Sequence, residues 1–287
     1  MIPAPFDYEV AESVEHAVEL LGSREDAKLL AGGHSLIPLL RLRFTRPALL
    51  VDIGRIDELR YVRDAGGKVA IGGMTRHHDI QHNPLVQEHC PVVSYAAGLI
   101  GDPQVRHRGT IGGSLAHADP AADFPAVLTA LDAEVVIRGP GGERTVPVGE
   151  FVTGVFDTVL GPQDVLTEIR VPKLGPTGWS YMKFTRRAQD WATVGVTTLV
   201  RRSNGTIDSA AIVFTNMAPK PVRAKAAEQA LTTPNDIEAA AGASLEGTDP
   251  PNDTQGSADY RRHLARVLVR RALGEAISSL NAGNVWA

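Results

Sequence analysis

The sequence has very little cysteine, no excess of basic charge and no long hydrophobic run. Cys90 is the only cysteine among the 287 residues. A single cysteine excludes a disulfide within the chain and argues against an iron–sulfur cluster ligated by this chain alone. Because Cys90 precedes a proline and lies beside apolar residues, we expect a buried thiol. The 29 lysines and arginines are outnumbered by 33 aspartates and glutamates, a net charge of −4, so nothing in the charge favours nucleic-acid binding.

No apolar run approaches the roughly 18 residues needed to cross a bilayer, so we expect no transmembrane segment. The first residues lack the charged leader and apolar core of a signal peptide. We therefore expect a cytoplasmic protein, with association with the inner face of the membrane left open.

Common signatures of nucleotide binding and catalysis are also missing. No Gly-Lys-Ser/Thr phosphate loop occurs, and no run of three spaced glycines matches the dinucleotide fingerprint. We find no catalytic triad or carboxylate pair and assign no catalytic residue. His78 and His82 stand four apart, as on one helix face that could hold a metal, but no third ligand with suitable spacing follows. We favour a polar helix face and assign no metal site.

Two paired-glycine turns are present instead. The apolar run that begins at Lys28 breaks at Gly32-Gly33 and continues into His34-Ser35, and a related turn follows at Thr110-Ile111-Gly112-Gly113-Ser114. Adjacent glycines allow a tight turn and a close approach of backbone N–H groups to an anion. One such turn could simply join a strand to a helix. Two together predict one extended ligand that is held from two sides.

The periodicity predicts three units, over residues 1–55, 56–176 and 177–287. The first unit follows the β-turn-α-β order of a small nucleotide-binding fold, and the third is rich in strands of an antiparallel sheet. Its last predicted helix, residues 260–273, begins with Arg261, Arg262 and His263. We predict a solvated basic face there, with contact to an acidic partner subunit as the alternative. The predicted helices cover 13–22, 36–43, 91–100, 224–231 and 260–273; a further helix is predicted to start over 75–80, and another to open at 118–125 and run through 131. The predicted strands cover 27–31, 49–53, 69–74, 135–138, 144–147, 165–172, 179–185, 193–201 and 209–215.

The two glycine turns together resemble those of the FAD-binding subunits of the molybdenum hydroxylases, the xanthine dehydrogenase family. Within that family the chain is most similar to the medium subunits of aerobic carbon monoxide dehydrogenases. The resemblance runs essentially end to end and is supported at residues 41–44, 102–106, 190–193 and 215–219. It implies an α+β fold: an FAD-binding domain of the vanillyl-alcohol-oxidase-like type in two α/β subdomains, followed by a C-terminal domain with an antiparallel sheet and helices.

The resemblance also implies the cofactor contacts. Leu29, Leu30, Ala31, Gly32, Gly33, His34, Ser35 and Leu36 would wrap the FAD pyrophosphate, with the amides of Gly32 to Ser35 facing it. Thr110, Ile111, Gly112, Gly113 and Ser114 would take its other side, with hydroxyl donors from Thr110 and Ser114. Asp123 would accept hydrogen bonds from flavin sugar hydroxyls, Ile100 would pack near the isoalloxazine, Leu166 would contact the adenine end through its backbone, and Lys183 would place a cation near the flavin.

The implied function is electron transfer from partner [2Fe–2S] clusters to FAD and on to an external acceptor such as a quinone. The implied partners are a large molybdopterin-binding subunit and a small [2Fe–2S] subunit, in a dimer of heterotrimers. The substrate could be carbon monoxide or, with the same role for this chain, an aldehyde, a purine or an N-heterocycle. A free-standing FAD oxidase and a cofactor-free assembly subunit are further alternatives, and the intact glycine turns argue against the latter. Covalent attachment of flavin to His34 stays open beside the non-covalent binding that the resemblance implies.

Overall fold

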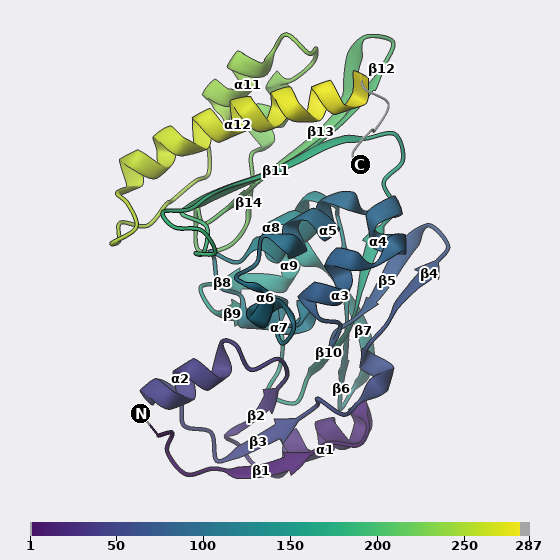
Figure 1. Cartoon of the computed structure of the whole chain (residues 1–287), viewed down its shortest axis with the longest axis vertical. Helices are drawn as coiled ribbons and strands as arrows, with labels where there is room; N and C mark the ends of the chain where they lie inside the picture. Colours follow the sequence, from purple (N-terminus) through teal and green to yellow (C-terminus); the bar gives the residue numbers. More distant parts are fainter. Residues whose placement is uncertain (1, 282–287) are drawn as a thin grey trace.

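The computed structural model of the chain describes residues 2–281, and its three larger sheets follow one another along the long axis of the molecule (Figure 1). The N-terminal unit lies at one end and the C-terminal unit at the other. As predicted, the fold is α+β. Among the described residues, no helix is both long enough and apolar enough to cross a membrane.

The N-terminal unit is a three-stranded parallel sheet in the order β1-β3-β2, with strands β1 (Asp7–Val10), β2 (Ala27–Leu30) and β3 (Leu49–Asp52). Helix α1 (Val14–Ser23) begins where predicted, because the hydroxyl of Ser13 accepts a hydrogen bond from the backbone N–H of His16 at 3.1 Å. Helix α2 (Leu36–Leu42) connects β2 to β3. The sequence did not predict β1, which has only 4 residues, most of them exposed.

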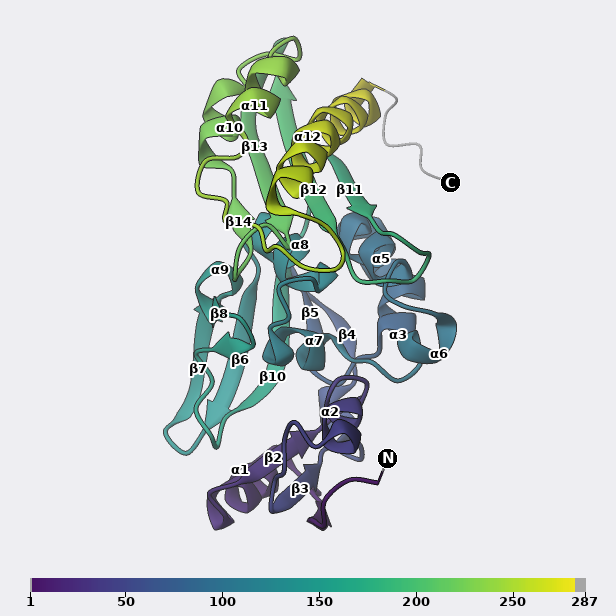
Figure 2. The same cartoon turned by 90° about the vertical axis from the view of Figure 1, so that its left-hand side faces the viewer.

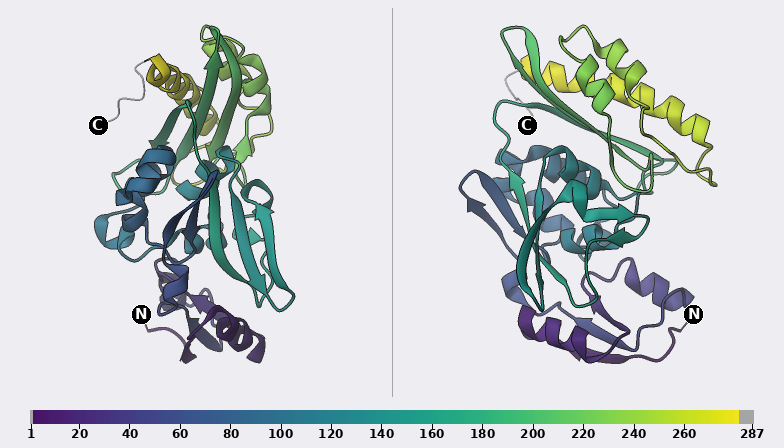
Figure 3. Two further views of the ribbon diagram at one scale, coloured as in Figure 1. Left: turned by 90° about the vertical axis from the view of Figure 1, so that its right-hand side faces the viewer. Right: turned by 180° about the vertical axis from the view of Figure 1, so that it is seen from behind.

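The middle unit is an antiparallel five-stranded sheet in the order β4-β5-β10-β6-β7. Seen from behind, its strands lie in front of the helices that cover the other face (Figure 3, right). Its strands are β4 (Val62–Ala65), β5 (Lys68–Gly72), β6 (Glu134–Gly139), β7 (Gly142–Pro147) and β10 (Val165–Pro172). Its helices are α3 (His77–His82), α4 (Pro84–His89), α5 (Pro91–Gly98), α6 (Pro103–Arg106), α7 (Ile111–His117), α8 (Asp123–Ala130) and α9 (Val148–Phe151), and a small hairpin is formed by β8 (Val152–Gly154) and β9 (Asp157–Thr158).

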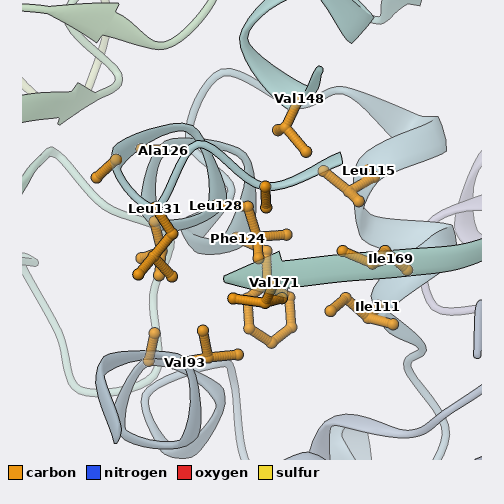
Figure 4. Close-up of a cluster of buried hydrophobic side chains, with 14 of the residues drawn as sticks. Val93, Ile111, Leu115, Phe124, Ala126, Leu128, Leu131, Val148, Ile169 and Val171 are labelled. Atoms are coloured by element: carbon orange, nitrogen blue, oxygen red, sulfur yellow. The ribbon is translucent and has the colours of Figure 1, made fainter. Parts of the chain in front are cut away.

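The largest cluster of buried side chains fills the space between this sheet and its helices. Phe124 of α8 is fully buried beside Val171 of β10 and Ile111 of α7 (Figure 4). Cys90 belongs to the same cluster, so the predicted burial of the thiol is confirmed. Burial raises the pKa of this thiol to about 12, which keeps it protonated and unreactive at neutral pH.

The C-terminal unit is an antiparallel four-stranded sheet, as predicted, in the order β11-β12-β13-β14. Its strands are β11 (Gly178–Phe184), β12 (Val194–Ser203), β13 (Thr206–Thr215) and β14 (Val222–Arg223); its helices are α10 (Lys225–Ala230), α11 (Ile237–Ala243) and α12 (Ala258–Asn281). Helix α12 packs on β11 and β12, while α5 and α8 contact this sheet from the side of the middle unit. Helices α5 and α8 are therefore held between two sheets (Figure 2).

The predicted solvated basic face of the last helix is wrong at Arg261. Its side chain is fully buried and donates to the carbonyl oxygen of Thr193 and, at 2.6 Å, to the carboxylate of Asp253. A buried guanidinium needs such partners, because an unpaired charge is costly to remove from water. Arg261 thus anchors the loop before α12 to the start of β12.

Candidate functional site

The two glycine turns lie side by side, although they are far apart in the sequence. We call residues 31–35 the first glycine loop and residues 109–114 the second glycine loop. A Cβ atom at Gly32 would overlap the carbonyl oxygen of Arg108 and lie 2.9 Å from the Cα of Gly109. Gly33 has a φ of +79°, a conformation that favours glycine. The predicted pairing of the two turns around one location is therefore present in the fold.

The first glycine loop offers unpaired backbone donors. Among the described residues, the amide N–H groups of Gly32, Gly33, His34 and Ser35 donate no hydrogen bond to any protein group. The hydroxyl of Ser35 makes no capping bond to α2. Successive amides without protein partners form the kind of concavity that binds anions. The loop can thus receive an anionic group without breaking any existing hydrogen bond.

The second glycine loop, by contrast, has its amides paired. The N–H of Ile111 donates to Thr75 at 3.1 Å and that of Gly112 to Gly73 at 2.9 Å. The N–H of Gly113 donates to the hydroxyl of Thr110 at 3.2 Å, which caps α7. What this loop leaves for a ligand is its hydroxyl groups: among the described residues, that of Ser114 has no hydrogen-bond partner.

A third glycine pair, Gly72-Gly73, contacts the second loop through a backbone hydrogen bond. The N–H of Gly73 donates to the carbonyl oxygen of Thr167 at 2.8 Å, and its own carbonyl oxygen accepts from Gly112. Leu166, a predicted cofactor contact, is buried here on β10, and the ladder of β10 with β6 is interrupted between Leu166 and Glu168. Sequence reasoning assigned no role to Gly73. The signal that could have found it was the third occurrence of paired glycines at the end of a strand.

Asp123 and Lys183, both predicted to contact FAD, are paired with each other. The ammonium of Lys183 lies 3.1 Å from one carboxylate oxygen of Asp123 and also donates to the carbonyl oxygen of Leu99 at 3.1 Å. The hydroxyl of Tyr181 donates to the other carboxylate oxygen. Burial raises the pKa of Asp123, and Lys183 opposes that shift. Both oxygens have protein partners here, so a ligand hydroxyl at Asp123 would share an oxygen that is already bonded.

Ile100 lies half-buried at the end of α5, against the large hydrophobic cluster. Its carbonyl oxygen and that of Gly101 accept from the guanidinium of Arg106 at 3.2 and 3.0 Å. Asp102 caps α6 by accepting from the N–H of Val105 at 2.8 Å. The segment from Ile100 to the second glycine loop is therefore held by hydrogen bonds within itself.

His77, the first residue of α3, is buried under the second glycine loop. The residue is 5 % exposed. Its backbone N–H donates to the carbonyl oxygen of Gly109 at 3.0 Å, and the centroid of its ring lies 5.3 Å from that of Phe124. Burial, with smaller electrostatic contributions from the neighbouring His34 and Arg106, lowers the pKa of His77 to about 3. The imidazole is thus neutral under ordinary conditions.

His78 and His82 do lie near each other on α3, with ring centroids 4.4 Å apart. The ring of His107 stacks on His78 at 3.9 Å. Within residues 2–281, no group of three His, Cys, Asp or Glu side chains has a geometry suited to a metal ion.

Two hollows in the surface lie away from the glycine loops. One, of about 220 Å³, surrounds Glu168, which accepts from Tyr61 at 2.6 Å and Arg63 at 2.7 Å. Burial raises the pKa of Glu168, but hydrogen bonds from Tyr61, Arg170 and Arg63 outweigh it and lower the pKa overall. The other, of about 420 Å³, lies beside the ion pair of Asp132 with Arg223. The charged groups named in both hollows are already paired within the protein, whereas the first glycine loop carries unpaired donors.

Comparison with known proteins decides the family. Residues 4–174 match the FAD binding domain in molybdopterin dehydrogenases, and residues 179–276 match the C-terminal domain of the CO dehydrogenase flavoprotein. The chain belongs to the FAD-binding medium subunits of the molybdenum hydroxylases. It is accordingly a subunit of a molybdenum-containing dehydrogenase, and the predicted family and fold class are confirmed.

The individual relatives span different substrates. The chain is 45% identical over 282 residues to the carbon monoxide dehydrogenase medium chain of Hydrogenophaga pseudoflava, covering 96% of this chain and 98% of that protein. It is 41% identical to subunit alpha of the 6-hydroxypseudooxynicotine dehydrogenase complex of Paenarthrobacter nicotinovorans, with 96% of both chains covered. A solved structure of the Hydrogenophaga pseudoflava carbon monoxide dehydrogenase, which lacks the Mo-pyranopterin moiety, superposes with a TM-score of 0.94 at 47% identity and covers 97% of this chain and 99% of that one.

Proposed function

We propose that this medium subunit binds FAD non-covalently between the two glycine loops and passes electrons from partner [2Fe–2S] clusters to an external acceptor such as a quinone. The unpaired amides of Gly32 to Ser35, next to the second loop, carry this proposal. A diphosphate is a good ligand for oriented amides, since charge-assisted hydrogen bonds are strong and need no lysine.

The two loops would contact the cofactor with different groups, because different groups of each loop already have hydrogen-bond partners in the protein. The first loop, with Leu29 to Leu36, supplies amides to the diphosphate, and the second loop supplies the hydroxyls of Thr110 and Ser114 while its amides hold the loop in place. Ile100, Asp123, Leu166 and Lys183 complete the proposed contacts with the rest of the cofactor. When bound, FAD supplies the electron chemistry, and the protein supplies position and electrostatics.

The proposed partners are a large molybdopterin-binding subunit and a small [2Fe–2S] subunit, in a dimer of heterotrimers. Since the substrate would be oxidised on the large partner, this chain needs no catalytic residue of its own. The relative with 45% identity favours carbon monoxide as the substrate of the complex. The relative with 41% identity supports an N-heterocycle dehydrogenase as the second candidate, and an aldehyde or a purine would require the same role of this chain.

The first experiment titrates the purified chain with FAD and then precipitates the complex with acid. We expect binding of one FAD per chain, release of the flavin into the supernatant, and no oxidation of carbon monoxide by the chain alone. Flavin that stays with the pellet would support attachment at His34 instead. Substrate turnover by the isolated chain would refute the role as an electron-transfer subunit.

The substrate is tested on the complete complex. Co-expression with the large and small subunits of the same enzyme, followed by assays with carbon monoxide, an aldehyde, a purine and an N-heterocycle, separates the candidates. We expect reduction of a quinone analogue with carbon monoxide as electron donor. Activity with one of the other three substrates alone would assign the complex to that class.

A further inference from the structure

Tyr181 is a buried tyrosine that holds one of the proposed cofactor contacts. It lies on β11 two residues before Lys183, and alternate residues of a strand point to the same face of a sheet. Both side chains therefore reach Asp123, the first residue of α8. The hydroxyl of Tyr181, a residue that is 2% exposed, donates to one carboxylate oxygen. The ammonium of Lys183 donates to the other at 3.1 Å.

The phenol of Tyr181 is a permanent donor. Burial and the neighbouring carboxylate of Asp123 raise the pKa of Tyr181 well above its ordinary value, so its hydroxyl keeps its proton throughout the range in which the protein works. The carboxyl of Asp123 is subject to opposing influences. Burial raises its pKa, whereas the charge of Lys183 and the hydrogen bond from Tyr181 lower it. The hydroxyl therefore favours the ionised form of the carboxyl, which is the form that accepts hydrogen bonds on both oxygens.

The neighbouring strand leaves space for this hydroxyl. Gly195 of β12 pairs with Lys183 in the sheet. A Cβ atom at position 195 would lie 2.9 Å from the Cβ of Thr215 and 3.2 Å from the hydroxyl oxygen of Tyr181. A phenol has only two side-chain torsion angles, and the ring is enclosed by the large hydrophobic cluster. The position of the hydroxyl oxygen is thus fixed by packing.

The two donors act differently on the carboxylate. Lys183 supplies a point charge on a flexible stem and by itself would let the carboxylate rotate. The rigid phenol of Tyr181 attaches the second oxygen and so fixes the plane of the carboxylate. Each carboxylate oxygen can accept a further hydrogen bond, so a ligand hydroxyl can still bind. The carboxylate also orients Lys183, whose ammonium donates to the carbonyl oxygen of Leu99, next to Ile100.

We infer that Tyr181 is a positioning residue for the cofactor, because its hydroxyl sets the orientation of the Asp123 carboxylate that would accept from the flavin sugar hydroxyls. Tyr181 acts through this carboxylate and needs no contact with FAD. The inference rests on the proposed function, in which Asp123 and Lys183 contact the cofactor.

The test is Tyr181→Phe, which removes one oxygen atom and keeps the ring. FAD is removed from the complete complex of this chain with its large and small partner subunits and is then titrated back. We expect the FAD affinity of the Tyr181→Phe complex to fall about tenfold or more, since hydrogen bonds to charged groups are strong. Wild-type affinity of this variant would overturn the inference.

Tyr61→Phe is the matched control. The hydroxyl of Tyr61 also donates to a carboxylate that a cation holds, that of Glu168, at 2.6 Å. The side chains of Glu168 and Asp123 are equally buried, each 5% exposed. Because Glu168 lies in a hollow away from the glycine loops, the Tyr61→Phe complex should keep the FAD affinity of the wild type.

A double-mutant cycle separates positioning from a purely structural role. If the hydroxyl acts through the carboxylate, Tyr181→Phe should have no further effect on FAD affinity in an Asp123→Ala background. An equal loss in both backgrounds would overturn the inference, because it would show that the hydroxyl acts independently of Asp123.

The pH profile of FAD affinity is a second measurement, and it requires no substitution at Asp123. The ionisable groups that act most strongly on this carboxyl are Lys183 and Tyr181 of β11, and Tyr95 of α5 acts on Tyr181. Protonation of Asp123 removes the charge that holds Lys183, so affinity should fall as the pH falls through the pKa of Asp123. Without the hydroxyl this pKa is higher, and the fall should begin at a higher pH in Tyr181→Phe.

An affinity loss of the same size at every pH would overturn the inference, since a structural defect has no reason to follow the ionisation of Asp123. Failure of the wild-type complex to bind FAD at any pH would instead refute the proposed function.

Discussion

The two glycine loops share a sequence pattern but differ in how their backbone is used. In the first loop, the amides of Gly32 to Ser35 have no protein partner among the described residues, whereas in the second loop Ile111, Gly112 and Gly113 all donate to neighbouring groups. A paired-glycine turn can thus either present donors to a ligand or attach one segment to another. The comparison predicts that substitutions in the first loop change mainly ligand binding, and those in the second mainly stability.

The largest effect on binding is expected for Gly32→Ala. The added Cβ would overlap the backbone of Arg108, so the loops must separate and the amides lose their common orientation. Since overpacking of this kind costs about 1–3 kcal/mol, FAD affinity should fall about ten- to a hundredfold, as measured by fluorescence titration. Gly67→Ala is the control, because a Cβ at Gly67 meets no atom within 4 Å. Unchanged affinity of Gly32→Ala would contradict the role of the first loop.

In the second loop, Gly112→Ala should act on the fold. The added Cβ would lie 2.6 Å from the carbonyl oxygen of Gly73. This oxygen accepts the hydrogen bond that the backbone N–H of residue 112 donates. We expect a loss of about 1–3 kcal/mol in the free energy of unfolding of the FAD-free chain, measured by chemical denaturation. Should Gly112→Ala lose FAD affinity at unchanged stability, the two loops would have the same role after all.

His77, under the second loop, predicts a dependence of stability on pH. Its pKa is lowered from 6.5 to about 3 in the folded chain. Below pH 6.5 the imidazole therefore binds a proton in the unfolded state but not in the folded state. The stabilisation is complete above pH 6.5 and is lost as the pH falls towards 3, at up to about 1.4 kcal/mol per pH unit. Denaturation at a series of pH values should show a shallower loss for His77→Gln. The variant at the exposed residue His82, His82→Gln, should keep the wild-type slope.

The smallest expected effects concern stability and distinguish the hydroxyls of Thr110, before α7, and Ser35, before α2. Thr110→Ala removes the cap that accepts from the N–H of Gly113, and should cost about 1 kcal/mol of unfolding free energy. Ser35→Ala removes a hydroxyl that makes no capping bond, so stability should stay within about 0.5 kcal/mol. Thermal melts of the two FAD-free variants measure both changes in stability. Equal losses of stability would show that the two loops do not differ in the role of the residue before the helix.

Local pattern was enough to predict most elements and the pairing of the glycine turns. Ser13 marked the start of α1, and the alternation from Val165 to Pro172 marked a strand. The pattern failed where a polar side chain finds its partner far along the chain. Arg261 was assigned to a solvated face because its neighbours in sequence are polar, yet its side chain is buried and donates to the carbonyl oxygen of Thr193.

The pairing of Asp123 with Lys183 could not be predicted for the same reason. The two residues lie 60 positions apart, and each was assigned separately to the cofactor by resemblance. Only the packing of β11 on α8 and α5 brings the ammonium between Asp123 and the carbonyl oxygen of Leu99. Resemblance assigns a residue to a region of the fold, while its hydrogen-bond partners follow from the three-dimensional packing.

The sandwich of α5 and α8 between the middle and C-terminal sheets has a consequence for how the chain unfolds. Because Tyr181 and Lys183 of the C-terminal sheet satisfy the buried carboxylate of Asp123, removal of that sheet would leave an unpaired charge and an uncovered apolar face on α8. The two family-defined segments should therefore melt together in a single cooperative transition. Cleavage at the Gly175–Gly178 connection should yield fragments that stay associated, and neither should fold when expressed alone.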